Sequence, residues 1–534
     1  MTMLARLVEF ALAQRLLVAL FAIAVMVAGG IAWRELPIDA FPDISPTQVK
    51  LILKAPGMTP AEVEQRVIVP LEMELLGIPH QSMLRSSAKY AIADLTLDFE
   101  QGTDIYWARQ QVAERFAVVR ADLPALIEGG LAPIATPLSD LYMFTVEGES
   151  YSLEERRTLL DWVIRPALRT VPGVADVNSL GGRVRSFEIV PDRLALAESG
   201  LGIDELQRAL ELNNGNDGAG RLEEGEEALV VRVTGALRGV EDIATTVVAV
   251  RGTRVLRVAD LATVQESSLT RYGAVTLDGR GETVEGLVVG LRGANAARVV
   301  ADVKTRLEEL ATSLPPGIRI EVFYDRSDLI QRATGTVMRA LIEATVLVVV
   351  LLVLFLGNLR AALVVAVTLP LAVLVTFVVM RLTGFSANLM SLGGLAIALG
   401  MLVDAAVVVV ENAVEHLAQP RTAGSSPRLH RIWRAAAEVA TPVASGVTII
   451  ALVFTPLLTL QGLEGKLFAP VALTIVFALV GSLLLSFTVI PVLASWLLRE
   501  GDYAEPWLMR RLREPYARAL GFVLNRPRLS LIHI

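Results

Sequence analysis

The sequence predicts an α-helical polytopic membrane protein that carries a large α+β domain outside the membrane. Its 534 residues are 53% hydrophobic, which is too apolar for an ordinary soluble protein. At the same time 20% of them are charged, which is too many for a chain buried entirely in lipid. The apolar residues are also unevenly distributed. One apolar segment near the N-terminus is followed by residues 34–335 without another, and five more segments then arrive close together.

The first membrane-spanning segment is predicted at Leu16–Ala32. Arg6 and Arg15 precede it, and Trp33, of a residue type enriched at membrane interfaces, follows it. A secretory signal peptide is the alternative, but such a peptide ends in a small-residue cleavage site. The chain continues instead as WRELPIDAFPD, so we expect this helix to be a retained membrane span.

Residues 34–335 are predicted to form repeated strand–helix–strand units. Two helices are expected to begin with a capping box, in which Thr59 pairs with Glu62 and Ser152 pairs with Glu155. Several units of this kind indicate small, similar βαβ-type subdomains. The expected elements are strands at 48–53, 91–99, 141–146, 283–289 and 318–324, helices at 104–123 and 296–310, and a further strand that begins at Val174.

Two details of this region refine the prediction. The two capped helices share a local pattern, because VIVP at 67–70 is matched by VIRP at 163–166. This likeness favours two subdomains of the same kind. Residues 182–267 are rich in Gly, Val and charge, and we interpret them as an insertion between the elements of the second subdomain.

Five apolar segments after residue 335 complete a set of six predicted spans. Basic residues in short loops indicate the orientation, because cytoplasmic loops carry an excess of Lys and Arg. Arg360 lies between the second and third spans, and four arginines without an acid lie between the fourth and fifth. The N-terminus and residues 499–520 are therefore expected in the cytoplasm. The spans are predicted at Val337–Leu356, Ala361–Val379, Ser386–Glu415, Val439–Leu460 and Leu467–Leu498, the last interrupted by Pro470 and Pro491, and the four arginines are Arg421, Arg428, Arg431 and Arg434.

The C-terminal part of the chain suggests a duplication. Residues 499–520 have a basic face and are predicted to form an amphipathic helix at the membrane interface. The stretch ARALGFVL at residues 517–524 echoes ARLVEFAL at residues 5–12. We therefore expect the chain to be the first half of a duplicated protein, with residues 521–534 as the truncated start of a seventh span.

The segment Ser386–Glu415 contains the strongest candidates for a functional site. Asp404 and Glu411 are seven residues apart, two helical turns, so both carboxylates point in the same direction. An ionised side chain at the membrane centre costs about 2.5–3.5 kcal/mol on insertion scales, so such acids usually serve a function. A structural role for Asp404, and an interfacial position for Glu411, are the alternatives. Small residues around Asp404 are expected to let neighbouring helices approach and cover it: Gly393, Gly394, Ala396, Ala398, Gly400, Ala405 and Ala406.

Composition excludes several other classes of function. The chain contains no cysteine, and its four histidines are scattered, so a disulfide framework and a thiolate metal site are excluded. No phosphate-binding or dinucleotide-binding glycine motif is present. The region outside the membrane shows no nucleophile and base at recognisable spacing. We therefore expect neither an enzyme nor a bound cofactor, and the net charge of −7 gives no indication of a nucleic-acid partner.

Together these segments resemble the resistance–nodulation–division (RND) efflux pumps and, within them, the heavy-metal efflux branch. The resemblance covers essentially the whole chain, as the N-terminal half of such a pump. The intramembrane acids and their flanks are its most specific part. The stretches that carry it are ELPIDAFPDISPTQV at 35–49, DIYWARQQVAER at 104–115, RPALRTVPGVADVNSLGG at 165–182, FYDRSDLI at 323–330, SANLMSLGGLAIALGMLVDAAVVVVENAVEHL from Ser386, and Phe454-Thr455-Pro456.

The resemblance implies a domain organisation and an assembly. It implies an inner-membrane homotrimer that exports heavy-metal cations in exchange for protons, together with a periplasmic adaptor and an outer-membrane channel. The expected divisions are 1–33 (cytoplasmic N-terminus and first span), 34–135 (first periplasmic porter subdomain), 136–181 with 268–335 (second porter subdomain), 182–267 (docking insertion), 336–498 (spans two to six), 499–520 (cytoplasmic amphipathic helix) and 521–534 (start of span seven).

The resemblance also implies roles for individual residues. It places the proton-relay acid at Asp404 and a second intramembrane carboxylate at Glu411, and it places their lysine partner in the other half of the pump. By this resemblance, divalent-cation pumps have an additional acid six residues before the relay aspartate. This chain has Ala398 at that position. Met390 occupies a position that resembles a methionine of copper and silver pumps, and a thioether suits Cu(I). The resemblance does not identify the metal, and packing is the alternative role for Met390.

Two other functions are alternatives to metal export. An exporter of drugs or solvents from the same superfamily would need an aromatic-lined porter, and only 6% of this chain is aromatic. A periplasmic sensing or accessory protein would not need the intramembrane acid pair. The sequence therefore favours proton-driven metal efflux over both.

Overall fold

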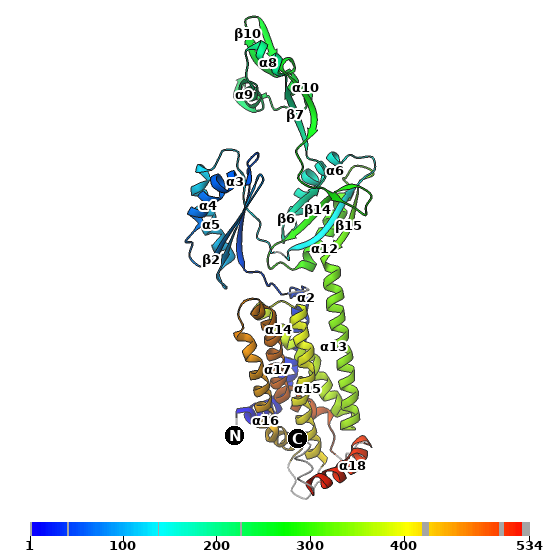
Figure 1. Cartoon of the computed structure of the whole chain (residues 1–534). Coiled ribbons are helices and arrows are strands. Elements are labelled where there is room, and N and C mark those ends of the chain that lie inside the picture. Colours follow the sequence, from blue (N-terminus) through cyan, green and yellow to red (C-terminus); the bar gives the residue numbers. More distant parts are fainter. Residues whose placement is uncertain are drawn as a thin grey trace. The chain divides into compact units, whose positions relative to one another are not determined.

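The computed structural model describes residues 3–39, 42–136, 138–224, 227–418, 427–500 and 507–525. The chain divides into two compact units, which we call unit 1 and unit 2. Unit 1 contains the long helices and a four-stranded sheet, and unit 2 contains a five-stranded sheet and an inserted lobe (Figure 1). Unit 1 comprises Met1–Ser139, Leu291–Ala301 and Arg326–Ile534, and unit 2 comprises Asp140–Gly290 and Asp302–Asp325.

Among the described residues, six helices of unit 1 are long and apolar enough to cross a membrane. Each of them overlaps one of the predicted apolar segments, although α15 begins three residues later than predicted and α16 ends at Phe454. Two further helices, α1 (Met3–Ala13) and α18 (Trp507–Leu524), lie near the ends of the chain. Residues 526–534, the largest part of the predicted start of a seventh span, lie outside the described residues. The six helices are α2 (Arg15–Glu35), α13 (Arg326–Leu356), α14 (Leu359–Thr383), α15 (Leu389–Ala418), α16 (Arg428–Phe454) and α17 (Gly462–Leu497).

Helix α17 corrects one prediction. It continues without a break through Pro470 and Pro491, where the sequence predicts an interruption. Both prolines are buried, and the Thr474 hydroxyl donates to the carbonyl oxygen of Pro470 at 2.7 Å. Proline is tolerated inside membrane helices because neighbouring helices and hydroxyl side chains satisfy the backbone groups that it frees. Packing therefore outweighs the local preference of proline for a helix end.

Helix α16 begins earlier than predicted. Arg428, Arg431 and Arg434, which the sequence places in a loop, lie in its first two turns, and Arg421 lies outside the described residues. The Arg431 guanidinium donates to the carbonyl oxygen of His416 near the end of α15, and Arg428 donates to the carbonyl oxygen of Leu498. These side chains join the ends of three helices.

The sheet of unit 1 is antiparallel, with the strand order β2-β3-β1-β4. Alternate residues of β1 are buried, namely Val49, Leu51 and Leu53, so one face of this strand lies in the core. Helical residues such as Leu71 and Val112 belong to the same core. The elements are β1 (Thr47–Lys54), β2 (Gln81–Lys89), β3 (Ile92–Phe99), β4 (Glu128–Leu131), α3 (Pro60–Val63), α4 (Val69–Leu75) and α5 (Ile105–Val119).

The sheet of unit 2 has the order β13-β14-β5-β15, and β6 also pairs with β14, at the edge opposite β5. Its buried face includes Phe144 and Val288. Gly286 lies on this face too, because a Cβ at Gly286 would be 2.3 Å from the Phe144 ring. The elements are β5 (Asp140–Glu147), β6 (Val174–Gly181), β13 (Val275–Thr276), β14 (Glu282–Gly290), β15 (Arg319–Asp325), α6 (Leu153–Leu159), α7 (Arg165–Arg169) and, from Asp302 onward, α12 (Ala296–Ala311).

The inserted lobe of unit 2 follows a two-stranded ribbon of β7 and β12 (Figure 1). Leu206, Ile243 and Val258 form part of its small core. The segment predicted as an insertion therefore has a core of its own. Its elements are β7 (Arg185–Pro191), α8 (Arg193–Ser199), α9 (Ile203–Asn213), β8 (Asn216–Glu224), β9 (Glu227–Thr234), α10 (Val240–Thr245), β10 (Val247–Arg251), β11 (Arg254–Arg257), α11 (Val258–Leu261) and β12 (Ala262–Ser268).

The two capped helices, one in each unit, share the same local features. Both predicted capping boxes are present, at Thr59 with Glu62 and at Ser152 with Glu155. In each unit the capped helix then passes through one π-helical turn, at Glu64–Ile68 and at Leu160–Ile164. A proline follows each turn two residues later, at the shared VIxP pattern. Proline removes one i→i−4 hydrogen bond, and the wider π turn shifts the bonding at this point.

Candidate functional site

Asp404 and Glu411 lie on the same exposed face of α15. The residues of this face are three or four positions apart, which is the spacing of one side of an α-helix. The opposite side of the helix is buried, with Leu395, Leu399 and Leu402 at 4% exposure or less. The sequence prediction that both acids point in one direction is therefore confirmed. The exposed face consists of Ile397, Gly400, Asp404, Val408, Glu411 and Glu415, and we call it the acidic face.

The buried side of α15 packs closely against α17. A Cβ at Gly394 would lie 2.7 Å from the carbonyl oxygen of Val471, so only glycine permits this approach of the two backbones. The Ser482 hydroxyl donates to the carbonyl oxygen of Leu402 at 2.9 Å, two residues before Asp404. These two contacts determine the rotation of α15 about its axis. They keep Asp404 on the side that faces away from α17.

The small residues near Asp404 have two different roles. Ala398, Ala405 and Ala406 are buried and, like Gly394, belong to the packed side of α15. Gly393 and Gly400 have no atom within 4 Å of a Cβ built on them. Small residues therefore bring the neighbouring helices close, as expected, but within the described residues they do not cover Asp404.

The side chain next to Glu411 is bound to a neighbouring helix. The Asn412 amide donates to the carbonyl oxygen of Ala435 in α16 at 2.8 Å, and one turn later His416 contacts Glu438 at 3.0 Å. Among the described residues, neither Asp404 nor Glu411 has a hydrogen-bond or ion-pair partner. The acidic face therefore combines two unpaired carboxylates with a helix of the length and composition of a membrane span.

Met390 does not join the two acids. It lies in the first turn of α15, partly buried, and fourteen residues of helix separate it from Asp404, which is about 21 Å at 1.5 Å per residue. Within the part of the chain that the structure describes, no group of three or more His, Cys, Asp and Glu side chains could hold a metal ion. Met390 is therefore not part of the acidic face.

Comparison with known proteins identifies the family. Residues 7–534 match the sequence model of the AcrB/AcrD/AcrF family. The chain belongs to this family of RND permeases. It is therefore a membrane protein of a transporter family, which agrees with its long apolar helices.

Three relatives of this RND chain are similar to it over nearly its whole length. Protein HelA of Legionella pneumophila is 39% identical over 97% of this chain and 50% of its own length. The cobalt-zinc-cadmium resistance protein CzcA of Cupriavidus metallidurans is 38% identical over 93% and 48% of the two chains, and the cation efflux system protein CusA of Escherichia coli K12 is 36% identical over 97% and 51%. The chain thus spans about half the length of these relatives.

A solved structure has the same fold. The crystal structure of a heavy metal efflux pump superimposes on this RND chain with a TM-score of 0.83 and 31% identity, over 98% of this chain and 51% of that protein. The RND resemblance seen in the sequence is thus confirmed by the family model, the relatives and the solved structure.

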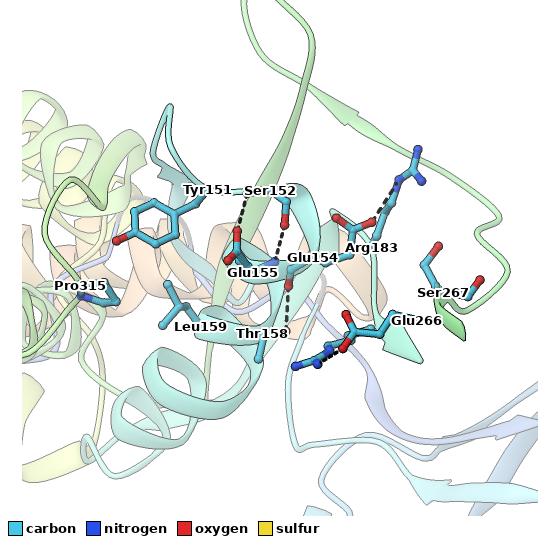
Figure 2. A pocket seen from close by; sticks show the side chains of 12 residues that line it. Tyr151, Ser152, Glu154, Glu155, Thr158, Leu159, Arg183, Glu266, Ser267 and Pro315 are labelled. Carbon is cyan, nitrogen blue, oxygen red and sulfur yellow. Dashed lines mark hydrogen bonds and ion pairs between the residues drawn. The ribbon is translucent and has the colours of Figure 1, made fainter. Parts of the chain in front are cut away.

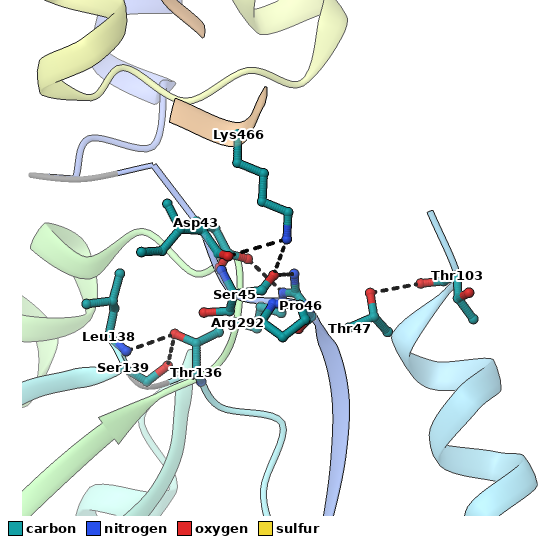
Figure 3. A network of polar contacts seen from close by, with 11 residues as sticks. Asp43, Ser45, Pro46, Thr47, Thr103, Thr136, Leu138, Ser139, Arg292 and Lys466 are labelled. Atoms are coloured by element: carbon teal, nitrogen blue, oxygen red, sulfur yellow. Dashed lines mark hydrogen bonds and ion pairs between the residues drawn. The ribbon is translucent and has the colours of Figure 1, made fainter. Parts of the chain in front are cut away.

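A second polar cluster in the RND chain lies where the long helices of unit 1 meet its sheet, and sequence reasoning missed it. Lys466 in α17 and Arg292 both donate to the short segment Asp43–Pro46, which leads from α2 to β1 (Figure 3). A cavity of about 720 Å³ lies beside it and is lined in part by Phe99 and Leu463. The one signal in the sequence is that Lys466 is the only lysine or arginine between Arg434 and Arg499.

A large cavity of unit 2 is lined by acids that already have partners (Figure 2). Its volume is about 910 Å³, and polar side chains form much of its wall. Glu154 lies 3.7 Å from Arg183, and Glu266 is paired with Arg185. The third acid, Glu155, accepts a hydrogen bond from the backbone N–H of Ser152 in the capping box. Because these carboxylates are already engaged, this cavity is a poor candidate for a cation site.

One unpaired carboxylate does lie on the sheet of unit 2. Glu285 of β14 is directly opposite Thr145 of β5, so both side chains lie on the same face, opposite the Phe144 face. Burial raises the pKa of the Glu285 carboxyl, and the nearby charge of Asp140 raises it further. Within the described residues, Glu285 has no ion-pair partner, and the buried Thr145 hydroxyl has no hydrogen-bond partner.

This environment predicts a pH-dependent gain in stability for Glu285→Gln. A raised pKa in the folded protein means that the charged carboxylate destabilises the folded state. Replacing it with neutral glutamine should therefore stabilise unit 2 at pH 7. The gain should disappear as the pH falls below the ordinary carboxyl pKa of 4.5, where both states are protonated. Thermal unfolding of both proteins at pH 7 and pH 4 measures it.

Glu282 of the same strand provides the matched control. Its pKa is lowered by a hydrogen bond from Arg271, so Glu282→Gln should lower stability at pH 7 or leave it unchanged. A gain for Glu285→Gln that is equal at pH 7 and pH 4 would show that the charge is not its cause.

Proposed function

We propose that the chain forms part of a proton-driven efflux pump for heavy-metal cations, in which Asp404 carries the proton. The observation that supports this most directly is the acidic face of α15. It presents an unpaired carboxylate halfway along a helix that is apolar enough to span a membrane. A charge of this kind in contact with lipid is unfavourable, so protein or water must cover the face in the working pump.

The chemistry of a carboxylate suits proton transport. When Asp404 is protonated it is neutral and compatible with an apolar surrounding, and when it is ionised it attracts a cationic partner. The two states therefore favour different packing of the acidic face. Moving one proton across the membrane also uses the membrane potential, which supplies about 2.3 kcal/mol per charge per 100 mV. Glu411, two turns away on the same face, is the second proton carrier in this proposal.

The names of the relatives support heavy-metal cations as the transported substrate. Their printed names refer to cation efflux and to resistance against cobalt, zinc and cadmium. Position 398 is where the pattern of divalent-cation pumps has an additional acid. This chain has Ala398 there, which is fully buried, and therefore has no additional carboxylate at that point. Met390 could supply a thioether ligand for a soft ion such as Cu(I). Both metal classes therefore enter the test.

The same proposal includes the location and the partners. Arg360 and the arginines at the start of α16 indicate that these helix ends face the cytoplasm. The two sheets would then lie in the periplasm of a bacterium with two membranes, and the pump would be an inner-membrane homotrimer. A periplasmic adaptor and an outer-membrane channel would complete the export path.

Growth of a metal-sensitive bacterium tests this proposal. The full-length protein would be produced with an adaptor and a channel in a strain without its own metal pumps. We expect at least a several-fold increase in the inhibitory concentration of either Cu(I) and Ag(I) or Zn(II), Co(II) and Cd(II). Protection against organic compounds with no protection against any of these metals would contradict the proposed cargo and favour an exporter of drugs or solvents.

A further inference from the structure

We propose that α17 transmits the protonation state of Asp404 to the sheet of unit 1 through Lys466. This inference rests on the proposed proton-driven function and adds a positioning residue to it. Lys466 has no contact with the proton site itself. It lies near the first turn of α17, at the other end of a chain of contacts that begins beside Asp404.

The first contact in this chain joins α15 to α17. The close approach at Gly394 and the hydrogen bond from Ser482 to Leu402 leave little freedom for α15 to slide or rotate against α17. Ser482 is 5% exposed, so its hydrogen bond is made in a protein interior, where such a bond is strong. A displacement of α15 near Asp404 therefore moves α17 as well.

The second contact joins α17 to the segment that precedes β1. The Lys466 ammonium group donates to the carbonyl oxygen of Ser45 at 2.6 Å and lies 3.4 Å from that of Ile44 (Figure 3). Ser45 is 6% exposed and Lys466 is partly buried, so this charged hydrogen bond is partly protected from water. Lys466 and Ser45 are 421 residues apart in sequence, and the bond connects α17 with the segment that leads into β1.

The same segment is held from its other side by Arg292. The Arg292 guanidinium lies 2.7 Å from the Asp43 carboxylate and donates to the carbonyl oxygens of Ser45 at 3.1 Å and Pro46 at 3.3 Å. The Ser45 carbonyl oxygen thus accepts hydrogen bonds from both cations. Residues 43–46 are consequently held firmly enough to follow a displacement of Lys466.

The third contact is the covalent continuation into the sheet. β1 begins at Thr47, directly after the held segment, and it is an inner strand that pairs with both β3 and β4. The Thr47 hydroxyl also donates to the carbonyl oxygen of Thr103 at 3.3 Å, just before α5. A movement of residues 43–46 therefore reaches the centre of the sheet rather than a loose loop.

Two other ion pairs join the ends of long helices to neighbouring segments, and they serve as comparisons. Arg326 of α13 binds Asp39 at 2.8 Å, and Arg381 of α14 is paired with Glu35 at the end of α2. Neither pair involves α17, the helix that packs against α15 at Gly394. Lys466 is therefore the cation on which the coupling is expected to depend.

Hydrogen exchange of the full-length protein in lipid nanodiscs tests the coupling. Asp404→Asn imitates the protonated aspartate. We expect this substitution to change the amide exchange rate of peptides covering residues 42–54 at least threefold. The change should be lost in a Lys466→Gln background, because glutamine lacks the charge and the length, and it should be kept in Lys466→Arg. Arg381→Gln is the matched control and should leave the change intact.

This experiment distinguishes a failure of the proposed coupling from a failure of the proposed function. If Asp404→Asn leaves residues 42–54 unchanged, or changes them equally with and without Lys466, the proposed coupling is wrong. The exchange experiment needs no metal and no transport, so it remains decisive even if growth shows no metal resistance. Conversely, metal resistance that requires Asp404 but persists in Lys466→Gln would leave the proposed function intact and overturn the coupling.

Discussion

Asp404→Asn is expected to abolish the metal resistance conferred by the full-length protein, returning the inhibitory concentration to that of cells without it. Asparagine is nearly the same size as aspartate, so the packed side of α15 should be unaffected. It cannot bind and release a proton, however, and the acidic face would then have only one charge state. Growth across the two metal groups, with protein amounts compared by immunoblot, measures the effect.

The chain offers graded controls for this experiment. Asp404→Glu keeps the titrating group and should retain part of the resistance. Glu411→Gln should cause a smaller loss, because Glu411 lies nearer the end of the helix. Glu415→Gln lies on the same face one turn further along and should be close to wild type. Full resistance in Asp404→Asn would reduce Asp404 to a structural acid and refute the proton-relay role.

Gly394→Ala is expected to destabilise the helix bundle by about 1–3 kcal/mol, the usual cost of forcing a methyl group into a packed interior. The added Cβ would lie 2.7 Å from the Val471 carbonyl oxygen and 3.1 Å from its Cα. Both are backbone atoms, which cannot rotate away as a side chain can. The helices α15 and α17 would have to separate, and the Ser482–Leu402 hydrogen bond would weaken.

Gly393→Ala provides a control one residue away. A Cβ at Gly393 meets no atom within 4 Å, and alanine is the better helix former by about 1 kcal/mol. Gly393→Ala should therefore leave the stability unchanged or raise it in the thermal unfolding of the detergent-solubilised chain. Equal destabilisation by both substitutions would show that flexibility of the glycine pair, rather than the contact with Val471, is what matters.

Much of the fold could be predicted from local patterns. The six apolar segments, both capping boxes and the strands at β1, β3, β5, β14 and β15 follow from periodicity and composition over short windows. The common direction of Asp404 and Glu411 follows from the helical repeat alone. The VIxP pattern indicated two similar helices, although not the π turn that they share, because the turn depends on hydrogen bonding around the proline.

Other features depend on contacts between residues far apart in the chain. Glycines 393, 394 and 400 look alike in the sequence, yet only Gly394 meets a neighbouring backbone, because that depends on where α17 lies. Pro470 and Pro491 suggest a break that packing prevents. Lys466 gains its partner from a segment 421 residues away. Local sequence reports the preference of a few neighbouring residues, whereas burial and pairing arise from the summed contacts of the folded chain, which no short window contains.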